Sequence, residues 1–320
     1  MTPSRRALLA AAAGLSLATW CWPAAAQASL AYVTNEASGQ VSVLDTGRDE
    51  VVATLAVGGQ PRGLALSPDG RMLYLSDKTG NRLQVVRTSD GMTTATVPLG
   101  ESPEGISLSS DGRLVAAASE IDNAVVLVDA VRGERIASIR TSGKNPEHAV
   151  FSPDGRWLYV GAEDEAQVDV IDVAARRQVA SIPVGKRPRG IAFTPDGRRA
   201  YVACELDNAV HAIDVASQSP IVRIPAGEFA NGLAMHPRGH ELYVSNGRGG
   251  SVSVIDVPTQ AVVATIPVGR RPWNMALTPD GGRLYVANGR SDSVSVIDTV
   301  RRTKLADVAV GKLPWGVAIR

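Results

Sequence analysis

The sequence predicts an all-β fold, a ring of seven four-stranded sheets, from three observations. A strand of the type Val-Ser-Val-Ile-Asp recurs at a spacing of about 42 residues. Apolar residues make up 44% of the chain and aromatic ones only 4%, while Gly and Pro are frequent, as in short strands joined by tight turns. Seven such units fill residues 29–320. Repeats of this kind are typical of a seven-bladed β-propeller.

The first 28 residues differ from the repeats and are predicted to be a signal peptide. Arg5 and Arg6 precede an uncharged run, which ends before a small-residue site at residues 26–28. The run is shorter than the roughly 20 residues that span a bilayer, so we expect cleavage and no membrane anchor. The paired arginines also resemble a twin-arginine signal, so the Sec and twin-arginine pathways both stay open. Either one leads to the periplasm.

Charge and cysteine content limit the function classes. Loss of the two signal arginines leaves one more acidic than basic residue, so we expect no nucleic-acid partner. Cys21 leaves with the signal, and Cys204 remains as the one cysteine, unable to form an internal disulfide. Burial of apolar side chains must therefore supply the stability, and Cys204 is predicted to be a small buried residue.

Each repeat is predicted to contain four strands, named a to d from the channel outward. In the repeat at residues 188–227 they fall at 189–193, 200–204, 209–213 and 221–225. Strands a and b are joined by Thr194-Pro195-Asp196-Gly197, with Pro and Gly where a type I turn prefers them. We therefore interpret the turn aspartates as structural.

The two ends of the repeat array predict how the ring closes. After residue 28 the chain begins on a strand b, and it stops after a strand a. We expect residues 315–319 to pair with residues 30–35 and so complete the seventh blade. Such a closure removes the open sheet edge that a linear array would expose.

The tetrad Tyr32-Val33-Thr34-Asn35 is a literal instance of the signature that gives the YVTN family of propeller repeats its name. The chain after residue 28 resembles this family throughout, and is most similar to periplasmic propellers associated with catabolism that depends on pyrroloquinoline quinone (PQQ). The resemblance implies a setting in periplasmic alcohol oxidation, with a quinoprotein dehydrogenase or its cytochrome as partner. It supplies no catalytic residues.

Acidic side chains gather on the connections of three consecutive repeats, on the face that carries the d-to-a and b-to-c loops. There His148 replaces the usual glycine beside the channel. Carboxylates with one imidazole could hold a hard divalent cation such as calcium. The alternative is an ordinary solvent-exposed acidic rim that binds no metal. The metal candidates are Glu147, His148, Glu163 and Glu205.

A second group on the same face combines aromatic and basic residues. Aromatic faces beside guanidinium groups suit a planar anion, a description that PQQ with its three carboxylates meets. Packing of the tryptophans over the channel mouth is the alternative. The ligand-binding candidates are Arg62, Arg189, Phe229, Trp273 and Trp315.

The chain contains no phosphate-binding glycine loop, no Cys-x-x-Cys-His haem motif and no defensible Ser-His-Asp set. We therefore predict a monomeric, non-enzymatic periplasmic propeller that binds a partner protein or small ligand in PQQ-dependent alcohol catabolism. A metal-dependent lactonase-like enzyme or an electron-transfer propeller is the alternative, since propellers host both.

Overall fold

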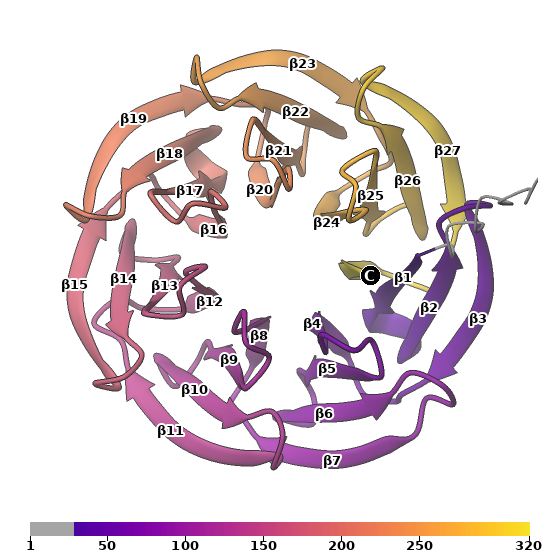
Figure 1. Cartoon of the computed structure of the whole chain (residues 1–320), viewed down its shortest axis with the longest axis horizontal. Coiled ribbons are helices and arrows are strands. Elements are labelled where there is room, and N and C mark those ends of the chain that lie inside the picture. The colour runs from indigo at the N-terminus through magenta and orange to yellow at the C-terminus, as the bar shows by residue number, and fades with distance from the viewer. Residues whose placement is uncertain (1–28) are drawn as a thin grey trace, which may run out of the picture.

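A computed structural model describes residues 29–320 as seven four-stranded antiparallel sheets arranged around a central channel (Figure 1). The predicted all-β, seven-bladed architecture is confirmed. The predicted signal peptide, residues 1–28, lies outside the described residues. No helix among residues 29–320 is long and apolar enough to cross a membrane.

Each blade runs from a strand a at the channel to a strand d at the rim (Figure 1). Two short 3-10 helices, η1 (Glu36–Ser38) and η2 (Glu205–Asp207), follow strands b of two blades. Written from strand a outward, the blades are β28 (Pro314–Ile319), β1 (Leu30–Asn35), β2 (Gln40–Asp45), β3 (Glu50–Ala56); β4 (Pro61–Leu66), β5 (Met72–Asp77), β6 (Arg82–Arg87), β7 (Thr93–Pro98); β8 (Pro103–Leu108), β9 (Leu114–Ser119), β10 (Ala124–Asp129), β11 (Glu134–Arg140); β12 (Pro146–Phe151), β13 (Trp157–Ala162), β14 (Gln167–Asp172), β15 (Arg177–Pro183); β16 (Pro188–Phe193), β17 (Arg199–Cys204), β18 (Ala209–Asp214), β19 (Ser219–Pro225); β20 (Ala230–Met235), β21 (Glu241–Asn246), β22 (Ser251–Asp256), β23 (Ala261–Pro267); and β24 (Pro272–Leu277), β25 (Arg283–Asn288), β26 (Ser293–Asp298), β27 (Thr303–Ala309).

The a-to-b turns have the structural role that their sequence predicts. Thr194 Oγ1 donates a hydrogen bond to Asp196 Oδ1 at 2.6 Å, and the same carboxylate oxygen accepts from the backbone N–H of Arg198 at 3.1 Å. Ser67 and Asp69 repeat the first contact in another blade at 2.6 Å. These carboxylates therefore close hairpins, as local side-chain-to-backbone bonds do in turns.

Closure of the ring is confirmed, since β28 pairs antiparallel with β1 and brings Ile319 opposite Ala31 and Val317 opposite Val33. Thr34 of the YVTN tetrad adds a contact on each side. Its hydroxyl accepts from the N–H of Gly316 at 2.9 Å and donates to the carbonyl of Arg62 in the next blade at 2.7 Å. One hydroxyl thus ties the closing blade to its neighbour.

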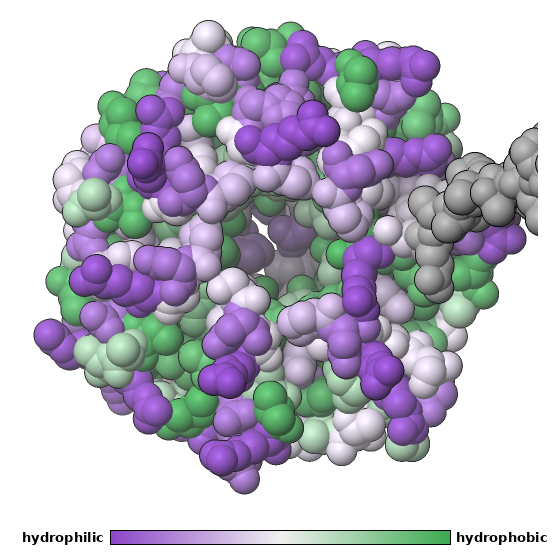
Figure 2. Space-filling model, in the orientation of Figure 1, coloured by the Kyte–Doolittle hydropathy of each residue, from purple (hydrophilic) through white to green (hydrophobic). Residues whose placement is uncertain are grey.

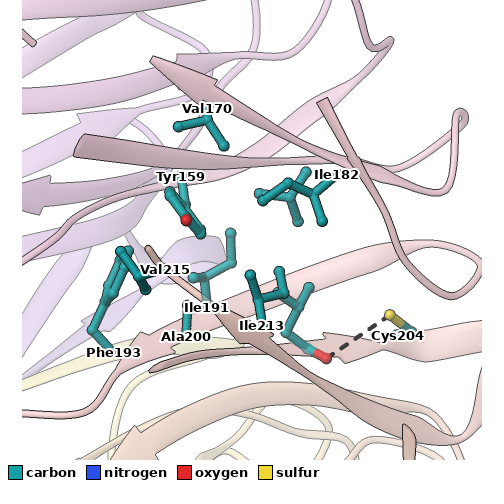
Figure 3. Packing of buried hydrophobic residues seen from close by; sticks show 11 residues of the cluster. Tyr159, Val170, Ile182, Ile191, Phe193, Ala200, Cys204, Ile213 and Val215 are labelled. Carbon is teal, nitrogen blue, oxygen red and sulfur yellow. Dashed lines mark hydrogen bonds between the residues drawn. The ribbon is translucent and has the colours of Figure 1, made fainter. Parts of the chain in front are cut away.

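Apolar side chains pack between neighbouring blades, and the interface of the β12 and β16 blades shows the pattern (Figure 3). The rings of Tyr159 and Phe193 meet edge to face at 4.9 Å. Cys204 is fully buried, its thiol donates to the carbonyl of Val202 at 3.8 Å, and burial raises the pKa of the thiol to about 12. The prediction that Cys204 is a small packing residue is confirmed.

The last residue of strand b fixes the d-to-a loop that leads into strand a of its own blade. In the β21 strand, Asn246 accepts from the N–H of Gly227 at 3.0 Å and donates to Ser253 at 2.9 Å. In the β5 strand, Asp77 likewise holds its loop, because its carboxylate accepts a hydrogen bond from the backbone N–H of Gln60 at 3.0 Å. These buried groups hold the d-to-a loops, which carry the site described below.

Removal of residues 314–320 should abolish cooperative folding, because it deletes β28 and exposes the inner edge of β1. We expect aggregation in size-exclusion chromatography and loss of the thermal transition in circular dichroism. The control Val300→Ser, at an 86% exposed turn position, should change stability by less than about 0.5 kcal/mol. A soluble truncated chain that melts cooperatively would contradict this closure.

Candidate functional site

The second residue of each strand a points to the channel mouth, and these seven side chains meet there. The residue before each strand's first position often has a left-handed backbone, with φ of 59° at Arg187 and 54° at Arg271. Most strands then begin with Pro, whose ring fixes φ near −65°. This turn aims the next side chain inward. The seven residues are Arg62, Glu104, Glu147, Arg189, Asn231, Trp273 and Trp315.

All seven line one pocket of about 220 Å³, which we call the vestibule. The centre of the ring is visibly hollow in the space-filling view (Figure 2). The vestibule's remaining walls come from residues just after strands b and from two d-to-a loops. These are Lys78, Glu120, Glu163, Arg187 and Arg271.

Arg189 lies at the centre of the first charged cluster and is only 12% exposed. Its guanidinium contacts Glu147 at 2.6 Å, Glu205 at 3.0 Å and Glu163. Arg187 and Arg271 join the same carboxylates from the rim, at 3.1 Å to Glu163 and 2.9 Å to Glu205. Buried charges persist only when paired in this way, so Arg189 is the group on which three acids depend.

A second cluster forms around Glu104, whose side chain is 1% exposed. Glu104 contacts Arg62 and accepts from Lys78 at 2.8 Å. Arg62 also reaches Glu36 at 3.1 Å, and Lys78 lies 3.9 Å from Glu120. Across both clusters, five cations face six carboxylates, so the fully ionised clusters carry a net charge of −1.

Three neighbouring carboxyls differ in proton affinity. Burial, and then the charge of Glu147, raises the pKa of both Glu104 and Glu163 to about 7, against the pull of their basic partners. Burial acts in the same direction on Glu147, but Arg189, His148 and Arg62 outweigh it and lower its pKa to about 2. Glu147 therefore stays ionised at neutral pH, while Glu104 and Glu163 exchange protons there.

Aromatic rings form the other wall. Trp273 and Trp315 lie 6.4 Å apart at 60°, and Trp315 stacks on His148 at 5.5 Å with the rings 9° from parallel. Trp315 is only 6% exposed, so its main contact is packing over the channel, whereas Trp273 is half-buried. Burial lowers the pKa of His148, so its imidazole is neutral at pH 7.

Four of the five predicted ligand-binding residues, Arg62, Arg189, Trp273 and Trp315, line the vestibule. Phe229 does not, and its ring lies beneath the guanidinium of Arg248 at 4.5 Å and near that of Arg271 at 5.7 Å. The expected separation of an acidic from a basic sector is wrong. Arg62 and Arg189 each lie between carboxylates, since buried acids require close cations.

The predicted metal ligands are only partly brought together. Glu147, Glu163 and Glu205 share the guanidinium of Arg189, while His148 turns to Trp315. Within residues 29–320, no three His, Cys, Asp or Glu side chains are grouped so as to hold a metal ion. A metal ion would have to displace Arg189 from the carboxylate oxygens of these glutamates. Metal binding by the four residues stays a prediction.

Six residues that line the vestibule were not among the predicted ligand-binding or metal residues: Lys78, Glu104, Glu120, Arg187, Asn231 and Arg271. Asn231 could have been found, because it occupies the second position of a strand a as Arg189 does. Lys78 follows its strand b directly, at the position that Glu120, Glu163 and Glu205 hold in other repeats. The positions of Asn231 and Lys78 within their repeats would thus have predicted both as site residues.

Seven four-stranded blades around a channel with a charged, aromatic-walled mouth define the chain as a β-propeller. This chain belongs to the YNCE-like β-propeller family, whose profile matches residues 5–319. None of the curated proteins matches it.

Solved structures with the same fold span most of the chain. Hydrazine synthase of Kuenenia stuttgartiensis is 27% identical over 84% of this chain and 92% of that one, with a TM-score of 0.77. A protein of unknown function from Desulfotomaculum acetoxidans is 16% identical over 91% and 98%, with a TM-score of 0.80. The dihydro-heme d1 dehydrogenase NirN is 18% identical over 90% and 74%, with a TM-score of 0.69. The last two show the fold alone.

Replacement of Arg189 by Met should lower the free energy of unfolding by about 3–5 kcal/mol, because three carboxylates lose their shared partner. Urea unfolding at pH 7 measures this change. Arg48→Met removes a pair that is 62% exposed on the arginine side, and should cost less than about 1 kcal/mol. Equal losses in the two variants would contradict the central role of Arg189.

The raised pKa of Glu163 predicts a pH-dependent stability difference between the wild type and Glu163→Gln. The folded state holds the Glu163 proton more tightly than the unfolded chain, so its contribution is complete below about pH 4.5 and is lost as the pH rises to about 7. Relative to the variant, the wild type should lose up to about 3 kcal/mol over that window in urea unfolding. Parallel stability curves would show that Glu163 has an ordinary proton affinity.

Proposed function

We propose that this protein is a periplasmic, non-enzymatic binding propeller that uses the vestibule to bind a planar organic anion in PQQ-dependent alcohol catabolism. The observation that carries this proposal is the convergence of one side chain from every inner strand on a single pocket. Ligand sites in propellers and other ring folds form where such strands open to solvent. A quinoprotein dehydrogenase or its cytochrome would dock on the same loop face.

The vestibule offers both a stacking surface and donors. Trp273 presents a half-buried indole, and Lys78, Arg187 and Arg271 are 30%, 38% and 22% exposed. A guanidinium has five N–H donors, so Arg187 and Arg271 can bind a ligand carboxylate beside their glutamate partners. These groups suit a flat molecule with carboxylates at its edge, such as PQQ.

Charge sets a condition on this binding. Each vestibule cation already contacts a glutamate, so an added trianion would enter a site with no net positive charge. Protons on Glu104 and Glu163 relieve the repulsion and free donors of Lys78 and Arg187. The vestibule therefore offers PQQ a stacking ring and N–H donors, and it suits the charge of PQQ when the two acids are protonated.

The setting rests on the signal-like first segment and on the resemblance to PQQ-associated periplasmic propellers. The alternative, a metal-dependent lactonase-like or electron-transfer enzyme, would require Glu147, Glu163 and Glu205 to be released from Arg189. A binding role uses the charged clusters as they stand.

Calorimetric titration of the purified chain with PQQ should show tighter binding at pH 6 than at pH 8, with proton uptake. Trp273→Ala should weaken binding by about tenfold, the value of one stacking contact. The control Trp157→Ala removes a tryptophan that lies under Arg156, away from the vestibule, and should leave the affinity unchanged. No heat of binding at pH 6, or equal effects of the two substitutions, would refute a vestibule site for PQQ.

A further inference from the structure

Another pocket lies away from the channel, between the blades that begin with β4 and β8 (Figure 1). Its volume is about 470 Å³, within the range of about 300–1,000 Å³ that small-molecule sites occupy. None of its residues lines the vestibule. We call it the blade groove, and its apolar walls are Met72, Tyr74, Val85, Ala95 and Val131.

The blade groove depends on one position in the turn from strand c to strand d. In every blade the fourth residue after strand c has a left-handed backbone, with φ between 50° and 72°. In two blades its side chain bonds to a strand-b tyrosine of the neighbouring blade. Gln260 donates to the hydroxyl of Tyr201 at 3.4 Å. Asp49 accepts from the hydroxyl of Tyr285 at 2.5 Å. The seven turn residues are Asp49, Gly91, Gly133, Arg176, Gln218, Gln260 and Arg302.

At the blade groove this turn residue is Gly133, so no side chain covers the space beside Tyr74. A Cβ on Gly133 would find only the Cβ of Ala95 within 4 Å, at 3.5 Å. Gly91 is the other glycine of the set, but a Cβ there would already lie 3.0 Å from Leu55. The turn position that is filled in other blades is therefore open at Gly133.

The polar groups that line the blade groove are already bonded within the protein. The hydroxyl of Tyr74 donates to a backbone carbonyl at 3.2 Å, and that of Thr94 donates to another at 3.1 Å. Ser67 donates to Asp69 at 2.6 Å. Among residues 29–320, none of the buried polar atoms without a partner lines the groove. Apolar contact must therefore supply the binding of any ligand here.

The mouth of the blade groove combines one acid, one base and an exposed aliphatic side chain. Asp69 and Arg132 both line it, so its rim carries no net charge that would favour an anion or a cation. Val131 is 81% exposed. Exposed apolar side chains beside a hollow are a mark of ligand-binding grooves, since a ligand removes them from water.

We propose that the blade groove is a second binding site, specific for a small, uncharged and mainly apolar molecule. Cavities of about 150 Å³ hold benzene, so a groove of about 470 Å³ admits a molecule of at least about two such rings. The ligand contacts Tyr74, Val85 and Val131, and the flexible side chain of Met72 adapts to its shape. This site is independent of the function proposed for the vestibule.

The test titrates the purified chain with N-phenyl-1-naphthylamine, an uncharged dye whose fluorescence rises in apolar surroundings. We expect one dye molecule to bind per chain, with an affinity that does not fall when sodium chloride is added, because apolar burial drives binding. The sulfonated analogue 1-anilinonaphthalene-8-sulfonate has similar rings and a negative charge, and should bind at least about tenfold more weakly. No saturable signal from the uncharged dye, or equal binding of both dyes, overturns the proposal.

Gly133→Gln introduces the residue that stands at the same turn position in two other blades, as Gln218 and Gln260. Their φ values of 50° and 57° show that glutamine adopts this backbone in this fold. The variant should weaken dye binding at least about tenfold, because its side chain enters the groove. The control Gly155→Gln also changes a left-handed glycine with space around it, outside the groove. It should match Gly133→Gln in melting temperature and the wild type in dye affinity.

Ala95→Leu fills the blade groove from strand β7 and should also weaken dye binding about tenfold. If Gly133→Gln does not fold, undiminished dye affinity in Ala95→Leu overturns the proposal. Light scattering tests a second copy of the chain as the occupant. A wild-type dimer that Ala95→Leu dissociates would assign the groove to self-association instead.

The two proposed sites fail separately. Neither Gly133 nor Ala95 lines the vestibule, so PQQ titration of both variants should match the wild type. Loss of dye binding in these variants, with PQQ binding unchanged, supports the blade groove as a site of its own. Displacement of the dye by PQQ in the wild type would place both ligands in one pocket and overturn the proposal.

Discussion

The fold depends on bringing seven inner strands close together around one channel and holding the ring shut. Neighbouring strands a approach so closely that five of the seven third positions must be glycine. The ring is shut by pairing of β28 with β1, reinforced by the hydroxyl of Thr34, which bonds to strands of two blades. The close approach of the inner strands also places the side chains at the channel mouth, because each strand a brings its second and third residues to fixed depths in the channel.

That geometry explains why the site is so highly charged. Side chains from different blades are forced within a few ångströms of one another, at a depth where water screens them poorly. Arg189 can then serve three carboxylates at once, and the charges of Arg189 and Arg62 keep Glu147 ionised against the effect of its burial. Burial, and then the charge of Glu147, raises the pKa of Glu104 and Glu163 to about 7.

Trp315 lines both the vestibule and a smaller hollow of about 130 Å³. Its indole stacks on His148, whose Nδ1 is buried without a hydrogen-bond partner in the described part of the chain. His148 and Asn274 stand at the third position of their inner strands, where the five other inner strands carry glycine.

The sequence alone determined the number of blades, the strands of each repeat and the pairing of the two ends, because these follow from periodicity and turn chemistry that are local to each repeat. The register of the repeat also pointed to Arg62, Arg189, Trp273 and Trp315 as neighbours. Only the tertiary structure decided which charges meet. It placed Arg189 among three acids, moved Phe229 out of the pocket to lie under Arg248, and left His148 without a polar partner above its hollow. Those outcomes depend on contacts between blades far apart in sequence, where the direction of each side chain and its burial are set by the closed ring.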